Sequence, residues 1–187
     1  MIRVFPIAAP TTLTNSFAED RGGRSHAGND LFANEGSPLV AVDSGELRSG
    51  TDPLGGNIVN LYSDDNARYY YAHLSTFANA QGNSTHTPPA PRRVQVGDLV
   101  GFLGKTGNAA ATPPHLHFEA HPNRGAAVDP YPALAAAPRV EPNSFGSRSG
   151  RSPLTLLLAA GAAGIGLWAL LRPREARRAF RRLVPRS

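Results

Sequence analysis

Apolar residues in the first 140 positions of this chain fall into short runs and not into helical stripes. The runs that predict β-strands are 39–42, 57–62, 69–74, 94–104 and 115–119, with clusters of Gly, Pro, Asn and Asp between them. Almost no helical periodicity is found before Ser152. Short strands separated by turn residues predict a mainly β domain on a compact antiparallel sheet, and 187 residues leave room for one such domain.

The pattern changes after residue 136. Residues 137–151 are rich in Pro, Ser, Gly and Arg, which predicts a flexible linker after a domain of residues 1–136. Residues 152–171 contain no charged side chain. About 20 such residues can cross a bilayer, so this segment predicts one C-terminal transmembrane helix. The alternative is a buried core helix, but a chain this short has no second domain in which such a helix could be buried.

Positive charge is concentrated in the last segment, residues 172–187. Seven arginines oppose one glutamate there, so this tail carries +6, the rest of the chain −1 and the whole chain +5. An arginine-rich segment beside a membrane helix favours contact with anionic lipid head groups on the cytoplasmic side. DNA is the rival partner. Phe180, Leu183 and Val184, interleaved with the arginines, favour the lipid surface.

Candidate chemistry begins with residues 115–119, His-Leu-His-Phe-Glu. Alternate side chains of a strand share a face, so His115 and His117 point one way while Leu116 and Phe118 point into the core. Two imidazoles on one face suit metal binding and proton transfer. The alternative is a pair of polar residues on a solvated strand face.

Two further segments supply matching side chains. His26 and Asp30 offer a nitrogen and a carboxylate oxygen from a loop that enters a strand. Together with a strand histidine they make a donor set that suits a catalytic zinc, which keeps one position for water. The aromatic run 69–71 predicts a strand that brings His73 to its end. The chain has no cysteine, which excludes disulfides and thiolate zinc sites.

Four motifs in this order resemble the lysostaphin-type (LytM-like) zinc metallopeptidases, which cut peptidoglycan peptides. The motifs are His-x-x-x-Asp at 26–30, Tyr-x-His-Leu-Ser at 71–75, Gly-x-x-Gly-x-Thr-Gly at 101–107 and His-Leu-His-Phe-Glu at 115–119. The resemblance runs from about residue 17 to residue 131. It implies a compact antiparallel sheet whose loops wall a narrow groove. One departure is Pro113-Pro114, since family members often carry a small residue or glycine before the second proline.

The resemblance also implies roles for individual residues. The residues that would bind Zn²⁺ are His26, Asp30 and His117. The catalytic pair would be His73 and His115, one taking a proton from water and the other stabilising the oxyanion, in an order that the sequence leaves open.

Three other polar side chains have weaker expectations. Glu119 shares the strand face of His117, where it either orients that imidazole or is a solvated carboxylate. The remaining histidines, His86 and His121, are expected at the surface.

These observations predict a zinc-dependent endopeptidase that hydrolyses peptide bonds of bacterial peptidoglycan. The positive-inside rule expects the catalytic domain on the cell-wall side of the membrane and the tail in the cytoplasm. Residues 1–6 lack the charged and apolar regions of a signal peptide, so a conventional export route is not expected. Glycine bridges and crosslinks that involve D-alanine and diaminopimelate are both within the family's reach.

Two alternatives stay open. The first is a virion-associated lytic enzyme or structural membrane protein of a bacteriophage, with the arginine-rich tail facing packaged DNA. The second is a non-catalytic peptidoglycan-binding or activator module on the same fold. All five metal and catalytic positions are intact, which favours an enzyme.

Overall fold

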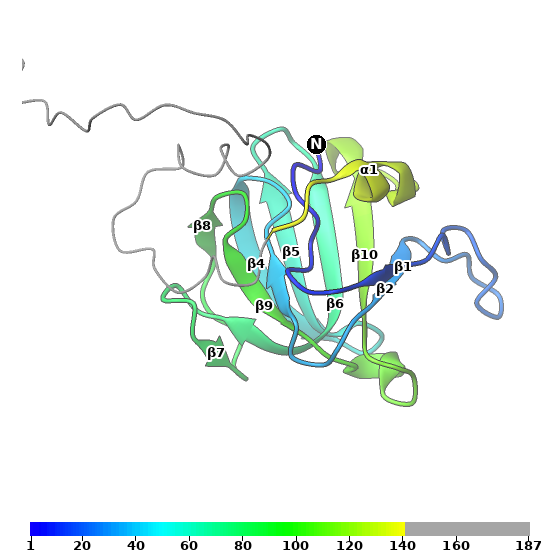
Figure 1. Cartoon of the computed structure of the whole chain (residues 1–187), viewed down its shortest axis with the longest axis horizontal. Coiled ribbons are helices and arrows are strands. Elements are labelled where there is room, and N and C mark those ends of the chain that lie inside the picture. Colours follow the sequence, from blue (N-terminus) through cyan, green and yellow to red (C-terminus); the bar gives the residue numbers. More distant parts are fainter. Residues whose placement is uncertain (141–187) are drawn as a thin grey trace, which may run out of the picture. The chain divides into compact units, whose positions relative to one another are not determined.

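Antiparallel pairing joins all the strands in residues 1–140, which are the residues that the computed structural model describes. The strands are β1 (Thr12–Leu13), β2 (Asn29–Phe32), β3 (Pro38–Val40), β4 (Gly45–Asp52), β5 (Gly56–Ser63), β6 (Arg68–Ala78), β7 (Ser84–Thr85), β8 (Arg92–Val94), β9 (Leu99–Leu103) and β10 (His115–His121). The main order across the sheet is β1-β2-β10-β6-β5-β4-β8, while β3 pairs with β9, and β7 and β9 pair with β6 (Figure 1). The predicted mainly β fold on an antiparallel sheet is confirmed.

The core covers one face of this sheet. Its largest fully buried side chains include Phe5, Tyr71, Phe77 and Phe118. Each such side chain contributes roughly 1.5–3 kcal/mol through its removal from water. The Tyr71 hydroxyl donates to the carbonyl of Val40 at 3.1 Å, so the one polar atom of this ring is satisfied inside the core.

One predicted strand is two strands in the structure. The run 94–104 is divided into the end of β8 and the whole of β9. Between them Gly97 has φ of 81°, a left-handed conformation that favours glycine, and its N–H donates to the carbonyl of Ala41. The chain therefore turns at this glycine, which an apolar count does not reveal.

Strand β6 is the longest strand and changes partners along its length. Its first half pairs with β5 and β10, and its second half pairs with β9 and β7. His73 lies at the change, inside the register shift of the β5 pairing and just before that of the β9 pairing, with φ of 67°. Its N–H leaves the ladder and donates to the carbonyl of Gly55 at 2.8 Å. This irregularity presents the imidazole of His73 at the sheet surface beside β10.

The packed domain extends beyond the predicted boundary at residue 136. A six-residue helix, α1 (Tyr131–Ala136), precedes that boundary. After it, the carbonyl of Pro138 accepts from Phe5 N–H at 2.9 Å, the Arg139 guanidinium lies over the Phe5 ring, and Val140 is buried. Residues 138–140, which fall in the predicted linker 137–151, thus contact the N-terminal segment.

The C-terminal predictions concern residues beyond this region. Residues 141–151 of the linker, the predicted transmembrane helix 152–171 and the tail 172–187 lie outside the described residues. Within residues 1–140, no helix has the length and apolar character needed to cross a bilayer.

Candidate metal centre and active-site groove

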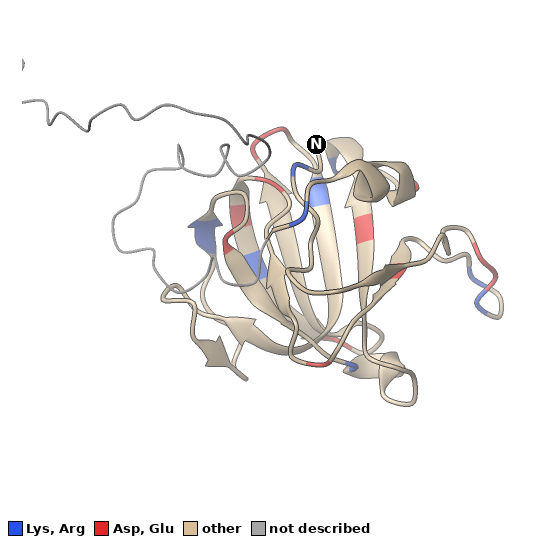
Figure 2. Cartoon of the chain, in the orientation of Figure 1, with Lys and Arg blue, Asp and Glu red and all other residues tan. Residues whose placement is uncertain are grey.

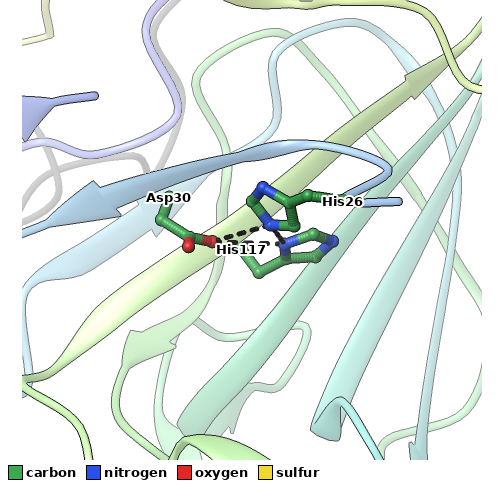
Figure 3. Close-up of side chains that lie close together, drawn as sticks. All are labelled: His26, Asp30 and His117. Atoms are coloured by element: carbon green, nitrogen blue, oxygen red, sulfur yellow. Dashed lines mark hydrogen bonds and ion pairs between the residues drawn. The ribbon is translucent and has the colours of Figure 1, made fainter. Parts of the chain in front are cut away.

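Strand register brings the three predicted metal ligands together. Asp30 on β2 is the direct cross-strand partner of His117 on β10, and His26 lies just before β2. His26 Nε2 is 2.8 Å from His117 Nδ1, and Asp30 Oδ1 is 3.2 Å from the first atom and 3.3 Å from the second. Figure 3 shows the three side chains pointing toward one another. The three groups form a largely buried cluster of possible metal donors.

In each imidazole, the nitrogen that points away from the cluster makes a hydrogen bond, and this bond determines which nitrogen faces the cluster. His26 Nδ1 lies 2.7 Å from the carbonyl of Ser16, and His117 Nε2 lies 2.9 Å from Glu119 Oε1. A carbonyl and a carboxylate can only accept, so these outer nitrogens carry the protons. The inner nitrogens are then left as two lone pairs directed at the same point as the Asp30 carboxylate.

This arrangement fits a tetrahedral cation. Donors about 2.0–2.1 Å from a tetrahedral Zn²⁺ lie about 3.3 Å from one another. The two distances from Asp30 Oδ1, 3.2 and 3.3 Å, match this value, and the two nitrogens lie closer together, at 2.8 Å. Two nitrogen lone pairs and a carboxylate oxygen share no proton among them, and a cation satisfies all three. Nitrogen and oxygen donors of this kind suit zinc, with a fourth position left toward the groove.

The close packing of these groups also shifts the pKa values of Asp30 and His117. Burial by itself raises the pKa of Asp30, but the imidazoles of His117 and His26 outweigh it and hold that pKa well below its usual range. Burial lowers the pKa of His117, but the carboxylates of Asp30 and Glu119 outweigh burial and raise it. Both shifts show that the cluster favours a positive charge at its centre.

The two predicted catalytic histidines lie beside this cluster. The ring centroids of His73 and His115 are 4.9 Å apart, and those of His73 and His117 are 6.1 Å apart. His73 Nδ1 is 2.9 Å from the carbonyl of Thr106, and His115 Nδ1 is 2.9 Å from the carbonyl of Pro113. Both Nδ1 atoms therefore carry protons, and each ring keeps its Nε2 lone pair.

The two imidazoles have different surroundings. Burial and then the neighbouring His115 lower the pKa of His73 to about 4, so the ring of His73 is neutral near pH 7. His115 Nε2 lies 3.9 Å from Asp30 Oδ1, next to the metal cluster. The Pro113-Pro114 departure leaves the position of His115 intact and supplies the carbonyl that holds its ring.

An open groove of about 710 Å³ gives access to all five side chains. Its floor is formed by β10, β6 and β2, and its walls by the loop before His26, the loop 52–55 and the segment 108–113. The short helical turn η1 (Gly107–Ala109) is tied to one wall because Asn108 N–H donates to the carbonyl of Leu54 at 2.9 Å. The loops expected to wall a groove are thus present.

Sequence reasoning missed a chain of polar residues behind His117. Glu119 Oε2 is 2.6 Å from His121 Nε2, and His121 Nδ1 is 2.8 Å from the carbonyl of Gly125. Arg68 Nη2 lies 2.7 Å from His121 Nε2. The expected surface position of His121 is wrong, because this residue is buried on the same strand face as His117 and Glu119. Extending the two-residue alternation by one step would have found it.

A second omission is Arg21. Its Nη2 donates to Asp30 Oδ2 at 2.8 Å, which holds the carboxylate so that Oδ1 faces the two imidazoles. Glu19 Oε2 lies 3.3 Å from the same nitrogen. Nothing in the local sequence marks this arginine, since the contact depends on how the loop folds back over β2. His86, in contrast, is exposed as expected.

Fold and site together define an antiparallel β protein with a largely buried His/Asp cluster, of a kind that can hold a metal ion, on the floor of an open groove. The chain belongs to Peptidase family M23, which it matches over residues 24–130. The sequence-based resemblance to lysostaphin-type peptidases is thereby confirmed.

Individual relatives agree with this assignment. The glycyl-glycine endopeptidase ALE-1 of Staphylococcus capitis is 36% identical over 121 residues, covering 62% of this chain and 30% of that protein. The L-Ala–D-Glu endopeptidase of Bacillus subtilis strain 168 is 30% identical over 148 residues, covering 73% of this chain and 43% of that protein. The chain thus spans less than half the length of either relative.

A solved structure shows the same fold at comparable identity. It is the catalytic domain of the antimicrobial peptidase lysostaphin from Staphylococcus simulans, with a TM-score of 0.54 and 30% sequence identity. The similarity covers 68% of this chain and 93% of that domain. The matched region is therefore essentially a whole catalytic domain of that peptidase.

Proposed function

We propose that this protein is a zinc-dependent endopeptidase that hydrolyses peptide bonds in bacterial peptidoglycan. One observation carries the proposal: three donors with converging lone pairs lie beside two imidazoles with free Nε2 atoms in an open groove. Membership of Peptidase family M23 and the activities named for the relatives support the same conclusion. The proposed ligands are His26, Asp30 and His117.

The donor set fits zinc, which in such a site acts as a Lewis acid that makes water nucleophilic near neutral pH and polarises the scissile carbonyl. His115, next to Asp30, is the better placed base, because its free Nε2 adjoins the metal cluster. His73 lies at the opposite side of the same space, where its Nε2 lone pair must first take up a proton; the imidazolium would then donate to the developing oxyanion or to the leaving amine. The carbonyls of Pro113 and Thr106 hold the two rings in these orientations.

The test separates metal ligands from catalytic groups. We expect His26→Ala, Asp30→Ala and His117→Ala to reduce bound zinc and to abolish release of muropeptides from peptidoglycan. His73→Ala and His115→Ala should keep zinc near stoichiometry while activity drops roughly a hundredfold or more. Zinc is measured by elemental analysis and products by mass spectrometry, and the exposed His86→Ala is the matched control.

Two outcomes would contradict the assignments. A full zinc equivalent in all three ligand variants would exclude the proposed metal site. Loss of zinc from the His73 or His115 variant would make that residue a ligand. A zinc-loaded protein that binds peptidoglycan and releases no fragment from any defined type would instead support the non-catalytic module.

We also propose that residues 152–171 anchor the enzyme in a membrane, with residues 172–187 on the cytoplasmic side against anionic lipid. This proposal rests on the uncharged run and on the arginines that follow it. The phage alternative places the same anchor in a virion membrane, with the arginines against DNA. Finding the gene among capsid or tail genes would favour the phage alternative.

A further inference from the structure

The charged side chains of the groove divide into satisfied groups and one free group. Six of them line it, and they are Arg21, Arg24, Asp30, Asp52, Arg68 and Glu119. Asp30 is held by Arg21, Asp52 by the Tyr70 hydroxyl and backbone N–H groups, and Glu119 by two imidazoles. Arg68 donates to Asn60 Oδ1 and lies against His121. Among the charged side chains that line the groove in residues 1–140, only the guanidinium of Arg24 has no hydrogen bond or ion pair within the protein.

The position of Arg24 is fixed by a turn built around two glycines. Gly22 and Gly23 have φ of 71° and 94°, and both N–H groups donate to Asp20 Oδ1. Arg21 N–H donates to the carbonyl of Arg24 at 2.8 Å. Arg21 and Arg24 thus flank one tight turn at the groove wall, and Figure 2 shows the basic and acidic segments of this loop between β1 and β2.

The two arginines are used differently. Arg21 is occupied by Asp30 and Glu19, whereas the exposed guanidinium of Arg24 remains available. Three guanidinium groups balance three carboxylates in the groove, so a divalent cation at the metal centre leaves a net positive charge. A groove of that charge with one free guanidinium at its wall is complementary to an anionic peptide.

We propose that Arg24 binds a free carboxylate of the substrate, so that the chain prefers carboxylate-bearing stem peptides to uncharged glycine bridges. This inference rests on the proposed function, because it assigns the substrate class of the same groove. A glycine bridge carries no carboxylate within its length and leaves Arg24 unpaired. A stem peptide with D-glutamate or diaminopimelate carries carboxylates beside its scissile bonds. The planar guanidinium donates two parallel hydrogen bonds to such a carboxylate.

The experiment compares substrates that differ by one charge. The purified, zinc-loaded full chain is given crosslinked muropeptides in which the D-glutamate or the diaminopimelate carboxyl is free or amidated, together with a pentaglycine-bridged peptide. The variants are Arg24→Ala, Arg24→Lys and the control Arg48→Ala, whose exposed side chain pairs with Glu46 and does not line the groove. Both kcat/KM and equilibrium binding of each peptide are measured, the latter by calorimetry on His115→Ala protein with and without the Arg24 change.

For the wild-type chain we expect kcat/KM and affinity to fall roughly threefold to tenfold when one particular carboxyl is amidated. Arg24→Ala should remove this preference, Arg24→Lys should keep part of it, and Arg48→Ala should behave as wild type. Added salt should reduce the preference. Equal hydrolysis of free and amidated substrates by the wild type, or an unchanged preference in Arg24→Ala, would overturn the inference.

The binding arm separates the two proposals. Carboxylate preference that depends on Arg24 without any hydrolysis keeps the inference and overturns the endopeptidase. Hydrolysis without a carboxylate preference keeps the endopeptidase and overturns the inference about Arg24. If neither hydrolysis nor a carboxylate preference is found, both proposals are overturned.

Discussion

At the scale of single residues, the proposed metal centre depends on groups that orient the proposed ligands. His26 is fixed by a backbone carbonyl and His117 by the carboxylate of Glu119. A carboxylate partner makes an imidazole a stronger base and therefore a better metal ligand. Burial raises the pKa of Glu119, but His117 and His121 outweigh burial and lower it, so this carboxylate is ionised near pH 7.

We predict that Glu119→Gln weakens zinc binding roughly tenfold to a hundredfold. The substitution keeps the shape and a hydrogen-bond acceptor but removes the negative charge beside His117 Nε2. Competition with a chelator of known affinity measures the change. Glu46→Gln is the control, because its exposed carboxylate pairs with Arg48 outside the groove. Equal zinc affinity in both variants would show that the charge of Glu119 does not act on the ligand.

Backbone strain at His73 gives a second residue-scale prediction. Its φ of 67° is unfavourable for any residue that has a Cβ, whereas glycine adopts this conformation without strain. His73→Gly should therefore be more stable than His73→Ala by about 1 kcal/mol, although both lack the imidazole. Urea unfolding in the presence of chelator measures the difference without any contribution from metal. An alanine variant as stable as the glycine variant would mean that β6 relaxes when the ring is removed.

At the scale of elements, the pattern of apolar and polar residues predicted strands that bury one face in the core and missed the other strands. The runs 57–62, 69–74 and 115–119 lie inside β5, β6 and β10. Buried residues alternate with residues nearer solvent over most of β5 and β10 and over residues 68–71 of β6. Strand β4 escaped because Leu47 is its one buried hydrophobic residue. It is held by its ladders to β5, the next strand in the chain, and to β8, and backbone pairing of this kind leaves no apolar pattern in the sequence.

The same reasoning explains which parts of the site the sequence could indicate. Motif spacing pointed to His26, Asp30 and His117, which lie at fixed positions on or just before two strands. The contacts of Arg21 and Arg68 arise from loop closure and cross-strand neighbours, so they need coordinates. Gly28 is a similar case, since its role is visible only in how closely β10 approaches it.

We predict that Gly28→Ala destabilises the domain and weakens zinc binding together. A Cβ at Gly28 would overlap the carbonyl oxygen and carbon of Phe118 on β10. Separation of β2 from β10 moves Asp30 away from His117, which are cross-strand partners. We expect a loss of about 1–3 kcal/mol in unfolding free energy, typical of overpacking, and a fall in zinc affinity. Gly50→Ala on β4 is the matched control, because a Cβ there meets no atom within 4 Å.

Two outcomes would contradict this explanation. If Gly28→Ala matched Gly50→Ala in unfolding free energy, the close approach of β10 would have no energetic consequence. If stability fell while zinc affinity stayed constant, the pairing of β2 with β10 would not position the ligands.

At the scale of the whole molecule, every proposed site residue lies between Arg21 and His121, well before the end of the described region. The segment 138–140 closes the domain against the N-terminal residues, because Val140 is buried with Val4 and Ala8, and Pro138 accepts from Phe5 N–H. Residues 1–140 thus hold every proposed site residue and the contacts that tie residues 138–140 to the N-terminal segment. We therefore expect hydrolysis not to require the rest of the chain.

We predict that a fragment of residues 1–140 stays in solution and cleaves peptidoglycan as the full chain does, whereas the full chain partitions with membranes or detergent. A fragment of residues 1–136 is the control: it should be less stable, because it lacks the buried Val140 and the acceptor of Phe5 N–H. High salt screens attraction between the arginine tail and lipid but leaves a spanning helix in place. Release of the full chain by salt or carbonate would exclude a span, and a folded but inactive 1–140 fragment would mean that later residues belong to the active unit.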